Sequence, residues 1–189
     1  MDKNILLIGR NPMVLVNLAS ALTEDEFGVQ TTHDVEQAGQ QFNGADFDLV
    51  AFGRGVDEAT NAKLRVEFTA QHPGIQFVDG LAPVTPLLVK QIKQALINKL
   101  TTEKAITAFT YQLAQNLQIN VTTVIDGQLT VDLYQLDAVH HTEQKTLISQ
   151  SVKAGNHTFL IRDLPDIKST INFLVAEIPN FELAVLPLQ

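Results

Sequence analysis

The first half of this 189-residue chain alternates short strand-like segments with stretches of helical spacing, and this alternation constrains the fold more than any other feature. The strand-like segments are residues 5–8, 29–32, 47–52 and 75–78, and most of their positions are apolar. Short runs of this kind indicate strands of a sheet that is covered on both faces. Because the helices between them act as crossover connections, the segments predict an α/β fold with a doubly wound parallel sheet.

Signals at the helix boundaries support this interpretation. Asn11-Pro12 combines a capping side chain with a proline at the first helical position, where its missing N–H costs nothing. Asp57-Glu58 places negative charge in the first turn of a later helix, which the helix dipole favours. Between Phe77 and the helix expected at 86–100 there is no room for both a fourth crossover helix and a fifth strand. We therefore expect a shortened sheet of four strands, unless a strand from the second half completes it.

The second half predicts a smaller α/β domain. Asp126-Gly127 lies between two alternating segments, which is a strong signal for a β-hairpin because both turn positions need positive φ. The other segments predict helices at 103–117, 143–153 and 165–178, and strands at 157–161 and 181–186. We therefore divide the chain into a first domain, 1–100, and a second domain, 101–189.

Composition excludes several classes of function. Thirteen Lys and Arg residues face 21 Asp and Glu residues, and the resulting net charge of −8 disfavours nucleic acid as a partner. The chain has no cysteine, which excludes thiolate catalysis and cysteine-ligated zinc. No apolar run approaches the length of a membrane span, and the first residues lack a signal-peptide core. We expect a cytoplasmic protein without a nucleic-acid or membrane partner.

Four segments of the first half carry a resemblance to a known family. Residues 3–8, 28–38, 46–52 and 67–73 resemble, in that order, the first strand, the second strand and helix, the third strand, and the end of the third helix of the receiver domain of response regulators. The resemblance covers roughly residues 1–100, and the second half resembles no family in this way. It implies a receiver-like fold and a place in bacterial signal transduction.

The residues that carry the chemistry of receivers are replaced in this sequence. Receivers bind Mg²⁺ through two acids that follow the first strand, and they form an acyl phosphate on an aspartate that ends the third strand. Gly9 and Arg10 occupy the positions of the two acids, and Gly53 occupies the position of the phosphoacceptor. Asp79 or Gly80 stands at the position of the family's hydroxyl switch residue. The resemblance therefore implies a degenerate receiver, or pseudo-receiver, that is not phosphorylated.

Two loops at the same edge of the predicted sheet form a candidate ligand site. The carboxyl edge of an open parallel sheet is the usual ligand crevice, and arginines beside a helix N-terminus bind anions. An alternative is that the arginines are simply solvated and the glycines only turn the chain. The candidate anion-binding residues are Gly9, Arg10, Asn11, Gly53 and Arg54.

No other constellation indicates catalysis or a metal. His140-His141 lies near Asp137 and Glu143, but adjacent histidines point in different directions, so a polar loop is the favoured interpretation. The sequence contains neither a Walker-type loop nor a G-x-S-x-G nucleophile elbow. We expect no catalytic residue, no metal and no cofactor.

These observations favour a non-enzymatic pseudo-receiver that acts as a protein-interaction module in bacterial signalling or transcriptional regulation. Two alternatives stay open: a sensor of a small anionic ligand at the sheet edge, and an enzyme of unfamiliar type in the second domain.

Two apolar rows in the stretch 86–117 also predict a homodimer packed through helices, unless the second domain folds back and covers them. The interface residues expected for this dimer are Leu88, Ile92, Phe109 and Leu113.

Overall fold

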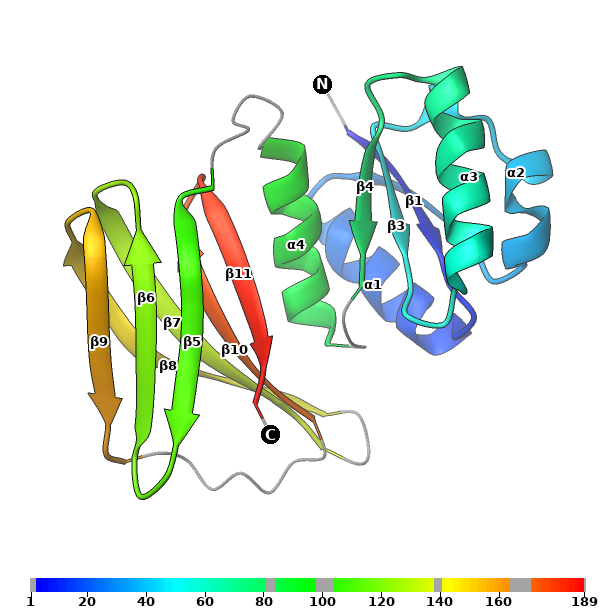
Figure 1. Ribbon diagram of the computed structural model, residues 1–189. Helices are drawn as coiled ribbons and strands as arrows, with labels where there is room; N and C mark the ends of the chain where they lie inside the picture. The colour runs from blue at the N-terminus through cyan, green and yellow to red at the C-terminus, as the bar shows by residue number, and fades with distance from the viewer. Residues whose placement is uncertain (1–2, 81–83, 98–103, 138–140, 164–170, 189) are drawn as a thin grey trace. The chain divides into compact units, whose positions relative to one another are not determined.

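Figure 1 shows the computed structural model of the chain, which describes residues 3–80, 84–97, 104–137, 141–163 and 171–188. The chain divides into two compact domains, Met1–Leu96 and Ile97–Gln189. We describe each domain by itself.

The first domain contains a parallel sheet of four strands in the order β2-β1-β3-β4. This order reproduces the start of the doubly wound order 2-1-3-4-5, so the first domain has a receiver-like fold that is shortened as expected. The described part of the first domain holds no fifth strand. The strands are β1 (Asn4–Ile8), β2 (Gly28–Thr32), β3 (Leu49–Phe52) and β4 (Gln76–Asp79), and the helices are α1 (Pro12–Glu24), α2 (Ala38–Gln41), α3 (Glu58–Gln71) and α4 (Thr85–Ile97).

Helices cover both faces of this sheet, which explains why its central strands are apolar at successive positions. On one face, the α3 side chains of Leu64 and Phe68 join the core around Leu6 and Val50. On the opposite face, α1 and α4 pack together against the sheet, and every core residue of this face lies within the first domain. The core of that second face consists of Ile5, Leu7, Leu15, Leu18, Leu22, Leu49, Ala51, Val78, Leu88 and Ile92.

Helices α1 and α3 begin where the sequence predicts. The Asn11 side chain caps α1, with its Oδ1 accepting from the backbone N–H of Met13 at 3.0 Å and of Val14 at 3.4 Å. The Asp57 side chain caps α3 by accepting from the N–H of Thr60 at 2.9 Å. Each cap satisfies backbone donors that the first helical turn leaves without partners.

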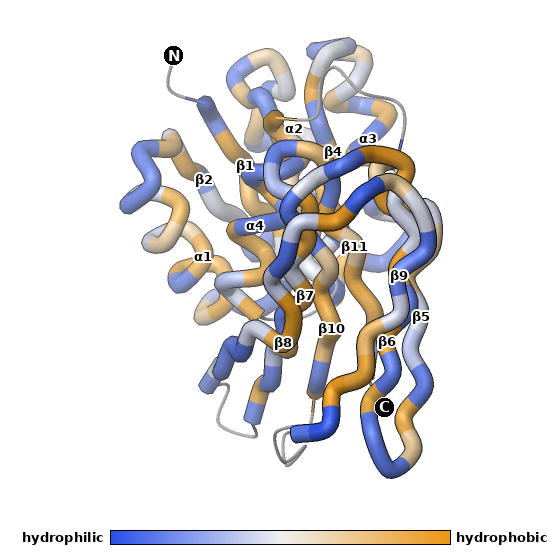
Figure 2. Tube along the Cα trace, turned by 90° about the vertical axis from the view of Figure 1, so that its left-hand side faces the viewer, coloured by the Kyte–Doolittle hydropathy of each residue, from blue (hydrophilic) through white to orange (hydrophobic). Residues whose placement is uncertain are grey.

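The described part of the second domain consists of strands in two antiparallel sheets, with orders β11-β10-β7-β8 and β5-β6-β9. The inner faces of both sheets contribute to one core, so the two sheets form a sandwich. Figure 2 shows hydrophobic residues along much of β10, the strand at the centre of this core. The strands are β5 (Ile106–Leu113), β6 (Leu117–Thr123), β7 (Gly127–Leu136), β8 (Thr142–Val152), β9 (Gly155–Ile161), β10 (Ile171–Ile178) and β11 (Glu182–Pro187).

The helices predicted for the second domain are wrong. The stretches 103–117 and 143–153 contain β5 and β8, and the described end of the stretch 165–178 is β10. β-Branched and aromatic residues along these stretches favour a pleated, half-buried strand over a helix. The strands predicted at 157–161 and 181–186 are confirmed as β9 and β11.

The Asp126-Gly127 turn does not close a hairpin. Hairpins exist in this domain, as between β5 and β6, but β6 and β7 belong to different sheets. The Asp126 carboxylate instead accepts from the backbone N–H of Ala154 at 2.9 Å and from Lys153 Nζ at 2.7 Å. These bonds join the loop between β6 and β7 to the loop between β8 and β9, both of which cross from one sheet to the other. Asp126 thus stabilises a crossing loop, although Asp-Gly in the sequence indicates a hairpin turn.

No described helix is both long enough and apolar enough to span a bilayer.

Candidate functional site

Three neighbouring strands of the first sheet, β1, β3 and β4, are each followed by a glycine at their carboxyl ends. The backbone N–H of Gly53 donates to the Ile8 carbonyl, and that of Gly80 donates to the Phe52 carbonyl, both at 2.8 Å. A Cβ on Gly53 would lie 3.3 Å from Gly9 Cα. The three strand ends therefore present closely spaced backbone, without side chains, as the floor of a site.

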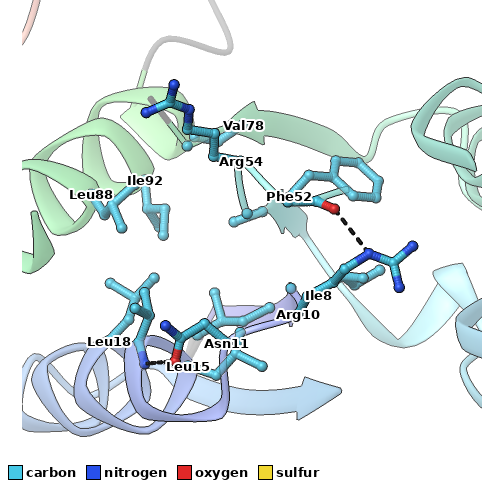
Figure 3. Close-up of a pocket in the computed structure, with 17 residues that line it drawn as sticks. Ile8, Arg10, Asn11, Leu15, Leu18, Phe52, Arg54, Val78, Leu88 and Ile92 are labelled. Atoms are coloured by element: carbon cyan, nitrogen blue, oxygen red, sulfur yellow. Dashed lines mark hydrogen bonds between the residues drawn. The ribbon is translucent and has the colours of Figure 1, made fainter. Parts of the chain in front are cut away.

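A cavity of about 310 Å³ opens above this floor, between α1 and α4 (Figure 3). Its side-chain walls are aliphatic, since the ring of the lining residue Phe52 packs against Phe77 on the opposite face of the sheet. Helix α1 contributes Val14, Leu15 and Leu18, helix α4 contributes Leu88 and Ile92, and the strands contribute Leu7, Ile8, Ala51, Phe52 and Val78. The polar side chains that line it are those of Arg10, Asn11 and Arg54.

Arg10 is bonded to neighbouring residues, so its guanidinium is not available to a ligand in the cavity. Its Nε donates to the Gly55 carbonyl at 3.0 Å, and its terminal nitrogen lies 2.6 Å from Glu36 Oε1 and 3.7 Å from Asp57 Oδ2. The hydrogen bond with Glu36 raises the pKa of Arg10 and lowers the pKa of the Glu36 carboxyl. Figure 3 shows the Arg10 side chain directed away from Leu18 and Ile92.

Arg54 differs from Arg10 in its surroundings. It is exposed at the opening of the cavity, and the structure gives it no hydrogen bond or ion pair with any residue it describes. Figure 3 shows the two arginine side chains pointing in different directions from the sheet edge. Of the two candidate anion-binding arginines, Arg54 therefore has a guanidinium available to a ligand.

Asn11 uses its side-chain oxygen to cap α1, which leaves its amide NH₂ group without a partner among the described residues. The site therefore combines an apolar interior with one uncommitted cation and one uncommitted amide donor at its rim.

The receiver positions for Mg²⁺ and phosphate hold no carboxylate. Gly9, Arg10 and Gly53 lie together at the sheet edge, and the nearby Asp79 carboxylate is bound by Arg65 at 2.6 Å and by the Asn61 amide at 2.9 Å. Across the described residues, no three His, Asp or Glu side chains form a group that could hold a metal ion.

Asp137 and His141 lie between β7 and β8 and are hydrogen-bonded to each other. The backbone N–H of His141 donates to Asp137 Oδ1 at 2.8 Å, and the N–H of Asp137 donates to the His141 carbonyl at 3.1 Å. His140 lies outside the described residues.

The four residues expected at a helical dimer interface do not lie on helices that could form it. Leu88 and Ile92 are buried at 8% and 0% exposure in the core of the first domain. Phe109 and Leu113 lie on a strand, β5, and Phe109 packs against the core of the sandwich. A continuous helical face that carries all four residues does not exist in this fold.

Sequence reasoning found the edge of the sheet but missed the cavity. It singled out Gly9 and Gly53, whereas the third glycine, Gly80, was matched only to a receiver's switch residue. A glycine directly after each of three parallel strands was a signal that could have indicated an open edge.

Comparisons with known proteins give limited likenesses. No family model matches the chain, and no curated protein matches its sequence. A solved receiver domain from the hybrid histidine kinase CckA is similar with 20% identity and a TM-score of 0.37, over 49% of this chain and 98% of that chain. A β-glucosidase from Kluyveromyces marxianus, solved in complex with glucose, gives 8% identity and a TM-score of 0.29, over 84% of this chain and 34% of that chain. The assignment of a receiver-like fold rests on the strand order and the two helical layers.

Proposed function

We propose that this protein is a non-enzymatic pseudo-receiver that works by binding, in cytoplasmic bacterial signalling or transcriptional regulation, and that it is not phosphorylated. The observation that carries this proposal is the replacement of every receiver carboxylate at the ends of β1 and β3 by Gly9, Arg10 and Gly53.

The chemistry of phosphoryl transfer supports the proposal. A covalent acyl phosphate needs a carboxylate nucleophile, and glycine has no side chain. Mg²⁺ needs oxygen ligands, and the Arg10 guanidinium would repel a dication at that position. Asp79 cannot readily substitute, because Arg65 and Asn61 already occupy its two oxygens.

Without phosphoryl transfer, we expect the carboxyl edge of the first sheet to bind a partner or a ligand. A protein partner is the first candidate, in keeping with the receiver-like scaffold. A small ligand is the second, and the cavity of about 310 Å³ specifically favours it, since small-molecule sites begin at about 300 Å³.

An enzyme in the second domain has less support. Asp132, the buried carboxylate in the described part of that domain, accepts hydrogen bonds from Thr146 at 2.7 Å and Gln144 at 2.9 Å. These bonds satisfy the oxygens of a buried carboxyl group and suit a structural role.

Incubation with acetyl phosphate and Mg²⁺, followed by intact-mass measurement, tests the proposal. We expect an unchanged mass, alongside a competent receiver domain that gains a phosphoryl group under the same conditions. The variant Gly53→Asp should also stay unmodified, because the acids that hold Mg²⁺ are still missing. If the protein without any substitution gains a phosphoryl group, and mild base releases that group, the proposal is contradicted.

A further inference from the structure

We propose that the cavity between α1 and α4 binds a medium-chain aliphatic carboxylate, with its chain among the apolar walls and its carboxylate at Arg54. This inference rests on the proposed function, since it assigns a ligand class to an edge that binds instead of undergoing phosphorylation.

The walls select an apolar chain. The side chains that surround the cavity are those of Leu, Ile, Val and Ala, because the Phe52 ring packs on the opposite face of the sheet. Leu15, Leu18 and Ile92 are each at most 7% exposed, so these walls are fixed by packing in the core of the first domain. A sugar or a nucleotide base would leave most of its polar groups without partners against such walls.

The volume sets the length of the chain. A protein cavity of about 150 Å³ with apolar walls holds a benzene molecule. The cavity here has about 310 Å³, roughly twice that space. It therefore accommodates about a dozen non-hydrogen atoms, which is the size of decanoate.

The free cation at the opening of the cavity, Arg54, favours a ligand with one negatively charged group. Arg10 is committed to Glu36 and Gly55, whereas Arg54 is exposed and has no partner among the described residues. The Asn11 amide NH₂ is a further uncommitted donor, which Figure 3 shows on the α1 side of the cavity, apart from Arg54. A single free guanidinium matches a carboxylate better than a phosphate ester, which carries up to two charges and three acceptor oxygens.

Calorimetric titration of the full chain with sodium hexanoate, octanoate, decanoate and dodecanoate tests the inference. Affinity should rise about fourfold for each added methylene that the cavity buries. The rise should stop near decanoate, because longer chains extend into water. No saturable binding by any member of the series, or a rise in affinity that continues unchanged from decanoate to dodecanoate, would overturn the inference.

Two pairs of measurements locate the ligand. Val14→Trp places a large ring at the cavity wall and should abolish decanoate binding, whereas Val16→Trp on the same helix, 62% exposed and away from the cavity, should leave it unchanged. Arg54→Gln should weaken decanoate binding by about two- to fivefold, the range for an exposed charge pair, and should not change binding of uncharged decanol. Equal binding by both tryptophan variants would overturn the assigned site, as would equal loss of decanoate and decanol in Arg54→Gln.

The outcome separates this inference from the proposed function. A chain that resists phosphorylation and also fails to bind decanoate would keep the proposed function and refute the ligand. A chain that accepts a phosphoryl group would refute the proposed function whatever its affinity for decanoate.

Discussion

Replacing Ile92 by alanine should destabilise the first domain by about 2–3 kcal/mol. Ile92 is 0% exposed and joins α4 to the core that α1 and the sheet share. The substitution removes three carbon atoms, which at about 0.8 kcal/mol for each buried methylene-sized group gives about 2.4 kcal/mol of lost transfer free energy. Buried Ile→Ala changes cost about 2–5 kcal/mol in general. We expect the lower half of this range, because Ile92 already borders a cavity and fewer contacts are lost.

The composition of the chain supplies a separate probe for each domain. All described helices lie in or begin in the first domain, so the helical circular dichroism signal reports its unfolding. The chain has no tryptophan, and its two tyrosines, Tyr111 and Tyr134, both lie in the second domain and report that domain by fluorescence. Urea unfolding of Ile92→Ala should therefore lower the midpoint of the helical transition.

Ile97→Ala is the matched control, since Ile97 ends the same helix and is 51% exposed. Its free energy of unfolding should change by less than about 0.5 kcal/mol. A loss below about 1 kcal/mol in Ile92→Ala, or a loss equal to that of the control, would refute the packing of α4 against this sheet.

Two further substitutions test the ends and the charges of the site. Asn11→Ala should cost about 1 kcal/mol through loss of the α1 cap, and Asn11→Ser should recover most of it, as measured by the helical transition in urea. Glu36→Gln removes the partner of Arg10, whose hydrogen bond holds the pKa of the Glu36 carboxyl below its ordinary value of 4.5. A carboxyl with a lowered folded-state pKa stabilises the protein above its unfolded pKa, and that stabilisation disappears as pH falls through the folded pKa. The unmodified protein should therefore be the more stable of the two at pH 7, and the difference should vanish in acid; a difference that persists in acid would show that the effect is not electrostatic.

The first domain could be predicted because its local signals agree with its packing. β1 and β3 are buried on both faces, so their sequences are apolar without interruption, and the caps at Asn11 and Asp57 mark helix starts directly. In such a domain each short segment carries enough information to identify its own element.

Two of the three wrong helices of the second domain, at 103–117 and 143–153, arise because the buried residues of β5 and β8 lie at helical spacing. The pairing of β5 with β6 shifts register between Ile106 and Ala108, so the next inward residue, Phe109, follows at a spacing of three. In β8 the buried residues Ile148 and Val152 are four apart because Gln150 between them is exposed, and this separation is two regular strand periods. An extra residue in β5 and an exposed residue in β8 therefore each produced the spacing of an amphipathic helix.

The candidate site was predictable in position but not in chemistry. The order of parallel strands brings the loops after β1 and β3 together, and the sequence suffices for that step. Glu36 lies 26 residues from Arg10 along the chain, and Asp57 lies beyond the next strand, so only the folded structure shows that both acids face this arginine. The sequence therefore assigned both Arg10 and Arg54 to the anion site, whereas in the structure Arg10 is paired with Glu36.

The proposed lack of phosphorylation and the cavity both involve glycines at the strand ends. Gly53 has no side chain that could act as a nucleophile, and this leaves room above the sheet edge. Gly80 shows that packing also demands this absence, because a Cβ there would lie 3.0 Å from Leu88 Cδ2 and 3.2 Å from the Phe52 carbonyl oxygen. A side chain at Gly80 would therefore displace the Leu88 side chain, which lines the cavity on the α4 side. The glycines at the strand ends thus leave room both for the cavity and for the α4 side chain that forms part of its wall.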